Sequence, residues 1–329
     1  MLLALSSCSV SKQTSTEKLP IVYSNDYNIG FYGIQKLHPF DTGKYAKVAK
    51  HLNKSLGISK EQFHVPYVIT DAELLKVHSQ TYLESLNNKD NIAAVTEMGI
   101  MRKLPIKMLQ NKLLKPFKLA TGGTLVAGEL AMQQGWAINL SGGYHHAKRN
   151  NGEGFCFFAD VNLLIETLRE KNLIKTAMVV DLDAHQGNGH QSIHGADSLV
   201  TIFDMYHKGI YPNETELFKY IDYNIPLAAG TKDEKYLSLL KAQLPKAIAA
   251  NKPDIIIYVA GTDIYELDPL GGLGITKQGI IERDAFVFQN AVDNNIPVVM
   301  TLSGGYHKDS GPIIGESIEN LLRTVLKDE

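Results

Sequence analysis

Two aspartates and a histidine stand at alternate positions in the segment from Asp181 to His185, which reads Asp-Leu-Asp-Ala-His. On extended backbone alternate side chains point the same way, so Asp183 and His185 can reach one point. A carboxylate oxygen and a neutral imidazole nitrogen are competent ligands for zinc and neighbouring divalent metals. Asp263 follows another apolar run, 255–259, and is the predicted third ligand. Three protein ligands leave one coordination position open for water, which is typical of a catalytic rather than a structural metal site.

The pentapeptide Ser-Gly-Gly-Tyr-His occurs at 141–145 and again at 303–307, each time after an apolar run. The first copy continues into a second histidine and so places His145 and His146 in tandem, whereas the second copy carries Tyr306 after two glycines. An apolar run that ends in glycines and ionisable side chains predicts a buried strand opening into a functional loop. We interpret the repeat as two strand ends that serve one site, not as a duplication.

Six short apolar runs predict the strands that would position these groups. They are near-continuous rather than alternating, which suits strands buried on both faces of a parallel sheet. The predicted strands are 21–23, 136–140, 177–180, 199–203, 255–259 and 298–302. The predicted helices are 45–56 (capped by Asp41 or Thr42), 124–134 (starting after Gly122 and Gly123), 162–171, 234–250, 277–294 and 314–326. This alternation predicts one parallel, doubly wound α/β domain over 21–329.

The composition is that of an ordinary globular protein, with 329 residues of which 44% are hydrophobic and 21% charged. A formal net charge of −2 without a long Lys/Arg block argues against a nucleic-acid partner. We interpret a basic cluster within 102–118 as a solvated helix face. No apolar run approaches the roughly 18 residues of a membrane span, so we expect none.

The two cysteines cannot form a disulfide framework. Cys156 lies in an apolar, aromatic segment and is predicted to be buried and inert. Cys8 follows an apolar stretch and two serines, which resembles the end of a bacterial lipoprotein signal, where small residues precede a cysteine that becomes lipidated. Two interpretations stay open for residues 1–20: a lipoprotein-signal remnant that anchors the protein to a membrane through Cys8, or a flexible N-terminus of a protein in the bacterial cytoplasm.

Taken together, these motifs resemble the histone deacetylase family, whose members share the arginase–deacetylase fold. The motifs that carry the resemblance are 142–147 (GGYHHA), 152–160 (GEGFCFFAD), 181–189 (DLDAHQGNG), 260–263 (AGTD), 268–273 (DPLGGL) and 303–306 (SGGY). A likeness to the class IV branch rests on 36–43 (KLHPFDTG), 135–139 (GWAIN), 204–206 (DMY) and 210–212 (IYP). The resemblance covers the chain from about residue 21 and implies a single-domain, three-layer α/β/α architecture with a mainly parallel sheet.

The resemblance implies a zinc-dependent amidohydrolase that removes acyl groups from lysine side chains. The single catalytic ion would be Zn²⁺, with Fe²⁺ as the alternative, and its ligands would be Asp183, His185 and Asp263. The catalytic residues would be His145, His146 and Tyr306. The substrate tunnel would be lined by His38, Gly154, Phe155, Tyr211, Leu270, Gly304 and Gly305. A structural K⁺ site would use the side chains of Asp181 and Asp204 and main-chain oxygens of Asp183, His185 and Met205.

Two positions within 181–189 bear on the mechanism. Asn188 stands where many family members have an aspartate, and it would orient His146 as Asp181 orients His145. A neutral amide stabilises an imidazolium less than a carboxylate does, so we expect His146 to stay neutral and to act as the general base. Gly187 occupies the position at which arginase-like enzymes carry an aspartate for a second manganese, which indicates one catalytic metal.

Three functions stay open at this point. The class IV likeness implies a preference for long fatty acyl groups over acetyl on a protein or peptide lysine. A second hypothesis changes the substrate to acetylated polyamines or another small amide; acidic residues at a narrow entrance would favour it, with Glu97 and Glu266 as candidates. A third is a metal-binding interaction module without catalysis, which the complete catalytic set disfavours. His38 is equally consistent with substrate gating and loop packing, and the oligomeric state is not predicted.

Overall fold

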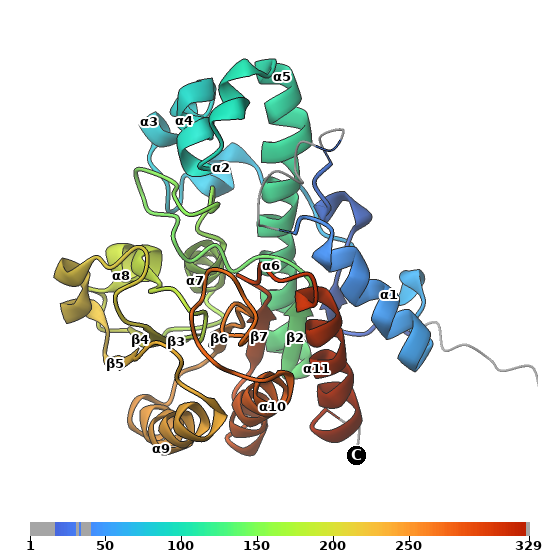
Figure 1. Ribbon diagram of the computed structural model, residues 1–329, viewed down its shortest axis with the longest axis vertical. Helices are drawn as coiled ribbons and strands as arrows, with labels where there is room; N and C mark the ends of the chain where they lie inside the picture. Colours follow the sequence, from blue (N-terminus) through green and yellow to red (C-terminus); the bar gives the residue numbers. More distant parts are fainter. Residues whose placement is uncertain (1–16, 31–32, 34–40, 327–329) are drawn as a thin grey trace, which may run out of the picture.

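Seven parallel strands form one sheet in the computed structural model, which describes residues 17–30, 33 and 41–326 (Figure 1). The strand order is β1-β2-β7-β6-β3-β4-β5. The strands are β1 (Ile21–Val22), β2 (Trp136–Asn139), β3 (Ala177–Asp181), β4 (Val200–His207), β5 (Tyr223–Leu227), β6 (Ile256–Val259) and β7 (Val298–Thr301). Each neighbouring pair is parallel, which confirms the predicted α/β class.

The central strands consist of buried residues along their whole length, as their continuous apolar runs predict. The edge strand β5 was not predicted. Its residues alternate between partly exposed and exposed positions before the buried Leu227, and it contains Pro226. A half-exposed edge strand tolerates proline and shows no continuous apolar run, so it escapes that signal.

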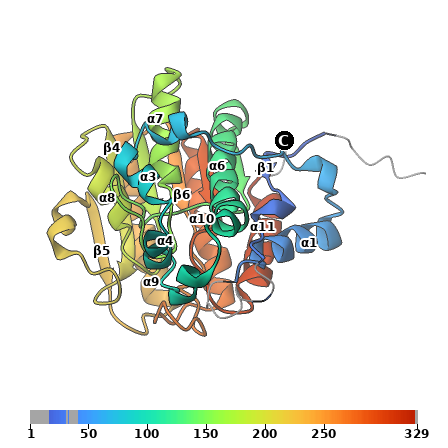
Figure 2. The same ribbon diagram turned by 90° about the horizontal axis from the view of Figure 1, so that it is seen from above.

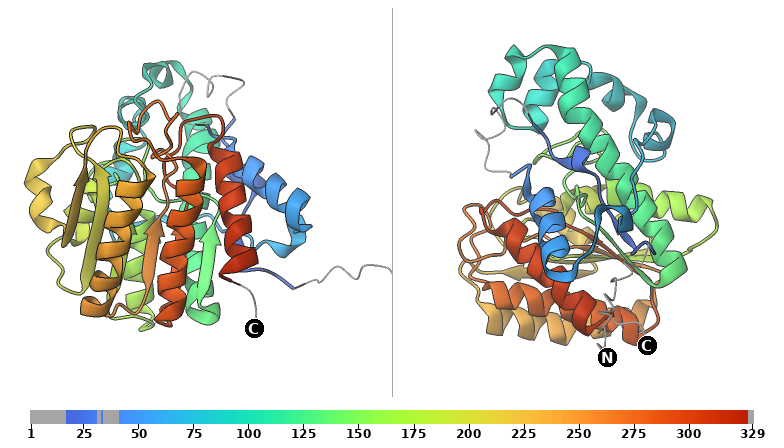
Figure 3. Two further views of the ribbon diagram at one scale, coloured as in Figure 1. Left: turned by 60° about the horizontal axis from the view of Figure 1, so that its bottom comes forward. Right: turned by 90° about the vertical axis from the view of Figure 1, so that its right-hand side faces the viewer.

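Helices cover both faces of the sheet. On one face α9 (Asp233–Asn251), α10 (Lys277–Asp293) and α11 (Ser310–Thr324) lie side by side, and α1 (Lys44–Leu56) packs against α11 (Figure 3). On the other face lie α6 (Lys115–Gln134), α7 (Asp160–Glu170) and α8 (Asn188–His194) (Figure 2). This three-layer α/β/α arrangement confirms the predicted architecture. None of the helices in the described ranges combines the length and apolar character needed to cross a bilayer.

Four short helices gather around the upper end of α6, beyond the edge of the sheet (Figure 1). They are α2 (Asp71–Leu74), α3 (Gln80–Ser85), α4 (Lys89–Val95) and α5 (Ile106–Leu109). The basic residues of 102–118 are spread over this region and the start of α6, and all except the half-buried Lys118 are exposed. Arg102 pairs with Asp90 and Lys118 with Asp71. The cluster is therefore solvated, as predicted, but it spans several short helical segments.

Two predicted helix starts are wrong, that of α6 and that of α11, which begins at Ser310 instead of at 314. Helix α6 begins at Lys115 and runs through Gly122 and Gly123 instead of starting after them. A Cβ atom at Gly122 would lie 2.0 Å from the Tyr67 carbonyl oxygen, and one at Gly123 would lie 1.9 Å from the Tyr27 hydroxyl. The glycines thus mark close packing, not a turn. Helix α1 starts within one residue of the prediction, but the predicted cap is wrong, because Gly43 occupies the N-cap position and no side chain caps the helix.

Candidate active site

Four adjacent strands, β2, β7, β6 and β3, deliver the polar motifs to one edge of the sheet. The segment 141–146 follows β2, 303–306 follows β7, 260–263 follows β6, and β3 itself ends at Asp181. Because the carboxyl ends of parallel strands lie at the same edge, motifs more than a hundred residues apart in the sequence meet there.

Asp183, His185 and Asp263 converge as a buried cluster whose ligand atoms all lie within 4.8 Å of one another. His185 Nδ1 lies 2.9 Å from Asp263 Oδ2 and 3.1 Å from Asp183 Oδ1. Burial alone would lower the pKa of His185, but the two carboxylates outweigh it and raise the pKa to about 10. Two buried carboxylates thus attract a positive charge at this point. Two oxygens and one imidazole nitrogen are a donor set that fits a divalent ion such as Zn²⁺.

Glycines allow the two carboxylates to approach each other. A Cβ at Gly304 would lie 2.3 Å from Asp263 Oδ2 and 2.6 Å from Asp183 Oδ2, and one at Gly261 would lie 2.2 Å from Asp183 Oδ2. The Gly304 amide donates to Asp183 Oδ2 at 2.8 Å, as does the Ser303 hydroxyl at 2.9 Å. These donors hold the Asp183 carboxylate in one orientation.

The tandem histidines stand beside this cluster with different partners. His145 Nδ1 lies 2.9 Å from Asp181 Oδ2, and His146 Nδ1 lies 2.8 Å from Asn188 Oδ1. Burial opposes charge on His145, but Asp181 and Asp183 outweigh it and raise the pKa to about 9. Burial, together with the charges of His145 and His185, holds the pKa of His146 well below its usual value. The pair therefore combines one readily charged imidazole with one neutral imidazole.

Tyr306 comes from the second glycine-rich loop and lies across from the histidines. Its ring centroid is 6.1 Å from that of His185 and 6.5 Å from that of Phe155. Gly305 has a φ of +129°, and a Cβ there would lie 2.2 Å from the Thr262 hydroxyl, so the turn requires glycine. Burial and the nearby carboxylates raise the pKa of Tyr306 well above its usual value, so its hydroxyl keeps its proton.

A pocket of about 580 Å³ opens from these residues to the surface. Its floor includes His146, His185 and Tyr306, and Gly154 and Phe155 form part of the wall. Tyr211 and Leu270 also line it and are 42% and 39% exposed, which places them at the rim. The remaining lining residues are Glu97, Met98, Ile100 and Ile210. A smaller hollow of about 20 Å³ shares four residues with this pocket and reaches Gly142, Tyr144 and Cys156.

Residues 38–324 of the chain match the family model of the histone deacetylase domain. The chain belongs to the histone deacetylase family. Among its relatives, Histone deacetylase 2 of Arabidopsis thaliana is 43% identical over 306 residues, covering 93% of this chain and 79% of the relative. The acetoin utilization protein AcuC of Staphylococcus aureus is 29% identical over 312 residues, covering 90% of this chain and 79% of AcuC.

The acetylpolyamine aminohydrolase of Burkholderia pseudomallei has a crystal structure that superposes with a TM-score of 0.73. It covers 91% of this chain and 97% of that one at 17% identity. At this identity the likeness concerns the fold alone, and it agrees with the arginase–deacetylase architecture of the sheet.

The residues predicted for the K⁺ site also come together, with Asp181 at the end of β3 just before Asp183 and Asp204 on the neighbouring strand β4. Asp181 on β3 stands opposite Asp204 on β4, both fully buried. Asp204 Oδ2 accepts from the Gly187 amide and from Gln191, whereas Asp204 Oδ1 is buried without a hydrogen-bond partner. Burial and the charge of Asp181 raise the pKa of Asp204 well above its usual value. An orphaned carboxylate oxygen beside a second carboxylate suits a monovalent cation. Met205 is buried next to it.

Three residues that support the candidate active site were missed from the sequence. Lys44 is fully buried, and its Nζ donates to the carbonyl oxygens of Ser303 (2.5 Å) and Gly304 (3.0 Å). Arg283, fully buried on α10, donates to the carbonyl oxygens of Leu182, Ala260 and Gly261 beneath the strand ends. Asp268 accepts from the amides of Tyr306 and Leu270. Only Asp268 lay in a recognised motif; nothing in the sequence distinguishes the other two from exposed helix residues.

The remaining predicted residues have different outcomes. Glu97 lines the pocket, whereas Glu266 is exposed and does not. His38 and Cys8 lie outside the described residues, so their predicted roles stay predictions. Cys156 is buried with a free thiol, as predicted.

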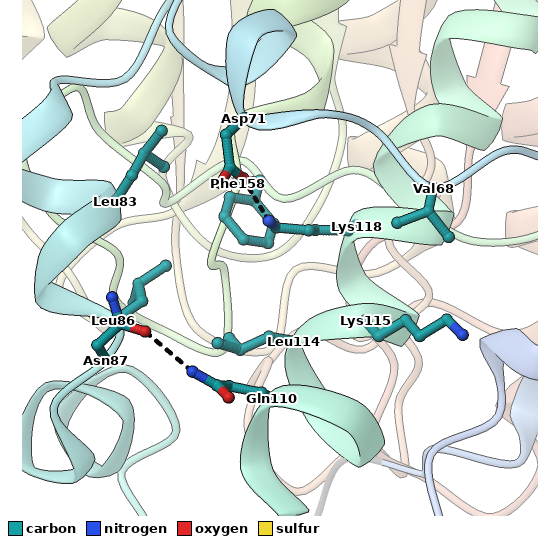
Figure 4. Close-up of a pocket in the computed structure, with 10 residues that line it drawn as sticks. All are labelled: Val68, Asp71, Leu83, Leu86, Asn87, Gln110, Leu114, Lys115, Lys118 and Phe158. Carbon is teal, nitrogen blue, oxygen red and sulfur yellow. Dashed lines mark hydrogen bonds and ion pairs between the residues drawn. The ribbon is translucent and has the colours of Figure 1, made fainter. Parts of the chain in front are cut away.

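A separate hollow of about 330 Å³ lies between α6 and the short helices (Figure 4). Its polar side chains pair with one another across the opening, Lys118 with Asp71 and Gln110 with Asn87. It contains none of the predicted site residues. The candidate active site is therefore the pocket at the strand ends.

Proposed function

We propose that this member of the histone deacetylase family is a zinc-dependent amidohydrolase that removes acyl groups from lysine side chains. The observation that carries the proposal is that Asp183, His185 and Asp263 converge beside the tandem histidines and Tyr306. His146, His185 and Tyr306 line the pocket directly. Phe155 and Tyr211 give the pocket aromatic walls, which suit the apolar methylene stem of a substituted lysine.

The chain's own residues supply the proton transfers that amide hydrolysis requires. A divalent ion bound by Asp183, His185 and Asp263 would supply Lewis acidity toward water and the carbonyl group. His146, neutral at pH 7, takes the proton from the attacking water, and the charged His145 provides a donor for the departing amine. The Tyr306 hydroxyl donates a hydrogen bond to the oxyanion as it develops.

The proposal is tested with fluorogenic acetyl-lysine and myristoyl-lysine peptides and the zinc-loaded protein. We expect hydrolysis that a chelator abolishes and added Zn²⁺ restores. Tyr306→Phe should lower kcat by about 10²–10³, the usual effect of removing one oxyanion donor. If the protein holds zinc and hydrolyses neither peptide, lysine deacylation is the wrong assignment, and a non-catalytic binding role or a different substrate takes its place.

The same assay measures acyl-chain preference. A lysine that enters from solvent places its acyl group beyond the catalytic residues, in the smaller hollow. At about 20 Å³ this hollow is near the roughly 10–15 Å³ that one water molecule needs. The geometry therefore favours acetyl, whereas the class IV likeness favours long fatty acyl groups. A higher kcat/KM for the myristoyl peptide would require the hollow to open around Tyr144 and Cys156.

A second candidate, hydrolysis of acetylated polyamines, is favoured by one observation. The carboxylate of Glu97 lines the pocket near its mouth and could bind a cationic amine of the substrate. If this substrate is the right one, acetylated polyamines should exceed both peptides in kcat/KM, and Glu97→Gln should reduce that advantage about tenfold. An unchanged ratio between polyamine and peptide would remove this candidate.

The site at Asp181, Asp204 and Met205 is assigned to K⁺ as part of the same proposal. Anchoring through Cys8 is a further proposal about where the enzyme works, and a mass spectrum of the mature N-terminus tests it directly.

A further inference from the structure

Asn188 is held by two carboxylates on the side away from His146. Its Nδ2 donates to Glu153 Oε1 at 2.5 Å and to Glu214 Oε1 at 3.0 Å. A carboxylate can only accept a hydrogen bond, so the atom that faces the two glutamates must be the NH₂ group. The amide oxygen of the fully buried Asn188 therefore faces His146.

This orientation determines where the proton of His146 lies. The Asn188 Oδ1 atom, 2.8 Å from His146 Nδ1, can only accept, so Nδ1 must carry the proton. In a neutral imidazole the other nitrogen, Nε2, is then free to accept a proton. A flipped Asn188 amide would present NH₂ to Nδ1, and the proton would move to Nε2, where it would block the base.

Lys148 keeps the two glutamates in place. Its Nζ lies 2.5 Å from Glu214 Oε1 and 3.1 Å from Glu153 Oε1, and its side chain is 15% exposed. Without this cation the two carboxylates, 26% and 25% exposed, would repel each other around one amide. None of the three residues lines the pocket or the smaller hollow, and both glutamates contact Asn188 directly.

We propose that Lys148, Glu153 and Glu214 are positioning residues that fix the Asn188 amide and thereby hold His146 in the tautomer with a free Nε2. The network also accounts for asparagine at this position. An aspartate here would lose both N–H donors and face two carboxylates at hydrogen-bond distance. This proposal rests on the proposed function for its kinetic consequences, but the tautomer itself can be observed without turnover.

The test uses variants that preserve shape and exchange donors for acceptors. In Glu153→Gln/Glu214→Gln the side chains no longer dictate which way the Asn188 amide points, and we expect kcat to fall about tenfold with KM within twofold. Asn188→Asp alone should also lower kcat about tenfold. Asn188→Asp combined with both glutamine substitutions should restore kcat to within about threefold, because the glutamine NH₂ groups can donate to the new carboxylate.

The control is Glu129→Ala, which removes an exposed ion pair with Lys171 on the surface and should leave kcat unchanged. Nitrogen-15 NMR of the imidazoles, with His146 assigned through His146→Gln, should report a protonated Nδ1 in the wild type and a mixture of tautomers in the double variant. The proposal is overturned if the double glutamine variant retains the wild-type kcat, or if it loses kcat while the His146 tautomer is unchanged. It is also overturned if the triple variant does not restore the kcat that Asn188→Asp loses. If the wild type hydrolyses no acyl substrate, the proposed function fails, and the NMR comparison still decides the role of the network.

Discussion

At the scale of single residues, the histidines of this chain differ through what surrounds them. His78 is 1% exposed, and its Nε2 accepts from the Ala159 amide, next to the residue that anchors the first glycine loop. That residue, Asp160, accepts from the amides of Gly143 and Tyr144. Burial lowers the pKa of His78 from 6.5 to about 4. The neutral imidazole is thus part of the support of the active site.

The lowered pKa of His78 predicts a loss of stability in weak acid. In the unfolded chain the His78 imidazole becomes protonated near pH 6.5, whereas in the folded chain it stays neutral down to about pH 4. The contribution of His78 to the free energy of unfolding is therefore fully present above pH 6.5 and is lost as the pH falls toward 4. Between pH 7 and 5 this group alone should lower the free energy of unfolding by about 2 kcal/mol. Urea titrations check this: His78→Gln, which keeps an acceptor for Ala159, should show a smaller drop. Parallel pH dependence of the two proteins would contradict it.

At the scale of elements, close packing requires the interior glycines of α6, although helix propensity alone would favour alanine at these positions. Alanine is favoured over glycine within a helix by about 1 kcal/mol. At Gly122, however, the added Cβ would meet the backbone oxygen of Tyr67 at 2.0 Å, and backbone cannot move aside as a flexible side chain can. We therefore expect Gly122→Ala to destabilise the protein by about 1–3 kcal/mol in thermal or urea unfolding. Gln133→Ala, at an exposed position of the same helix, is the control and should be near neutral.

The elements also show which parts of the fold and of the candidate site could be predicted from the sequence alone. Continuous apolar runs located the buried strands, and parallel pairing then required Asp183, His185 and Asp263 to meet, because strands β3 and β6 are neighbours. Edge strand β5, the short helices before α6 and the start of α6 were not predictable in this way, since tertiary packing decides them. The contact between Asn188 and His146 was predicted from the resemblance, and the two side chains lie 2.8 Å apart. The contacts of Asn188 with Glu153 and Glu214 were not predictable. They join the start of α8 to two separate loops, and neither Glu214 nor Glu153, although the latter lies in the motif 152–160, is marked in the sequence as a partner of Asn188.

At the scale of the whole molecule, the cluster of Asp183, His185 and Asp263 joins two neighbouring strands of the central sheet. An ion that binds the folded chain and not the unfolded one stabilises the fold by about 2.7 kcal/mol at one hundred times its Kd. We expect Zn²⁺ to raise Tm by several degrees and a chelator to reverse the shift. Asp263→Asn, which removes one carboxylate ligand, should abolish most of the response in differential scanning calorimetry. An equal shift in this variant would place the stabilising ion elsewhere.

The floor and the rim of the pocket come from different parts of the fold, and this affects how the substrate range of such an enzyme can change. The reacting groups come from strand ends that are fixed by buried backbone contacts, whereas the rim comes from three separate loops that contribute Glu97, Tyr211 and Leu270. A loop can accept insertions or new side chains while the strands beneath it stay in register. Mutations or grafted loops at the rim can therefore change the substrate range, while the residues at the strand ends stay the same.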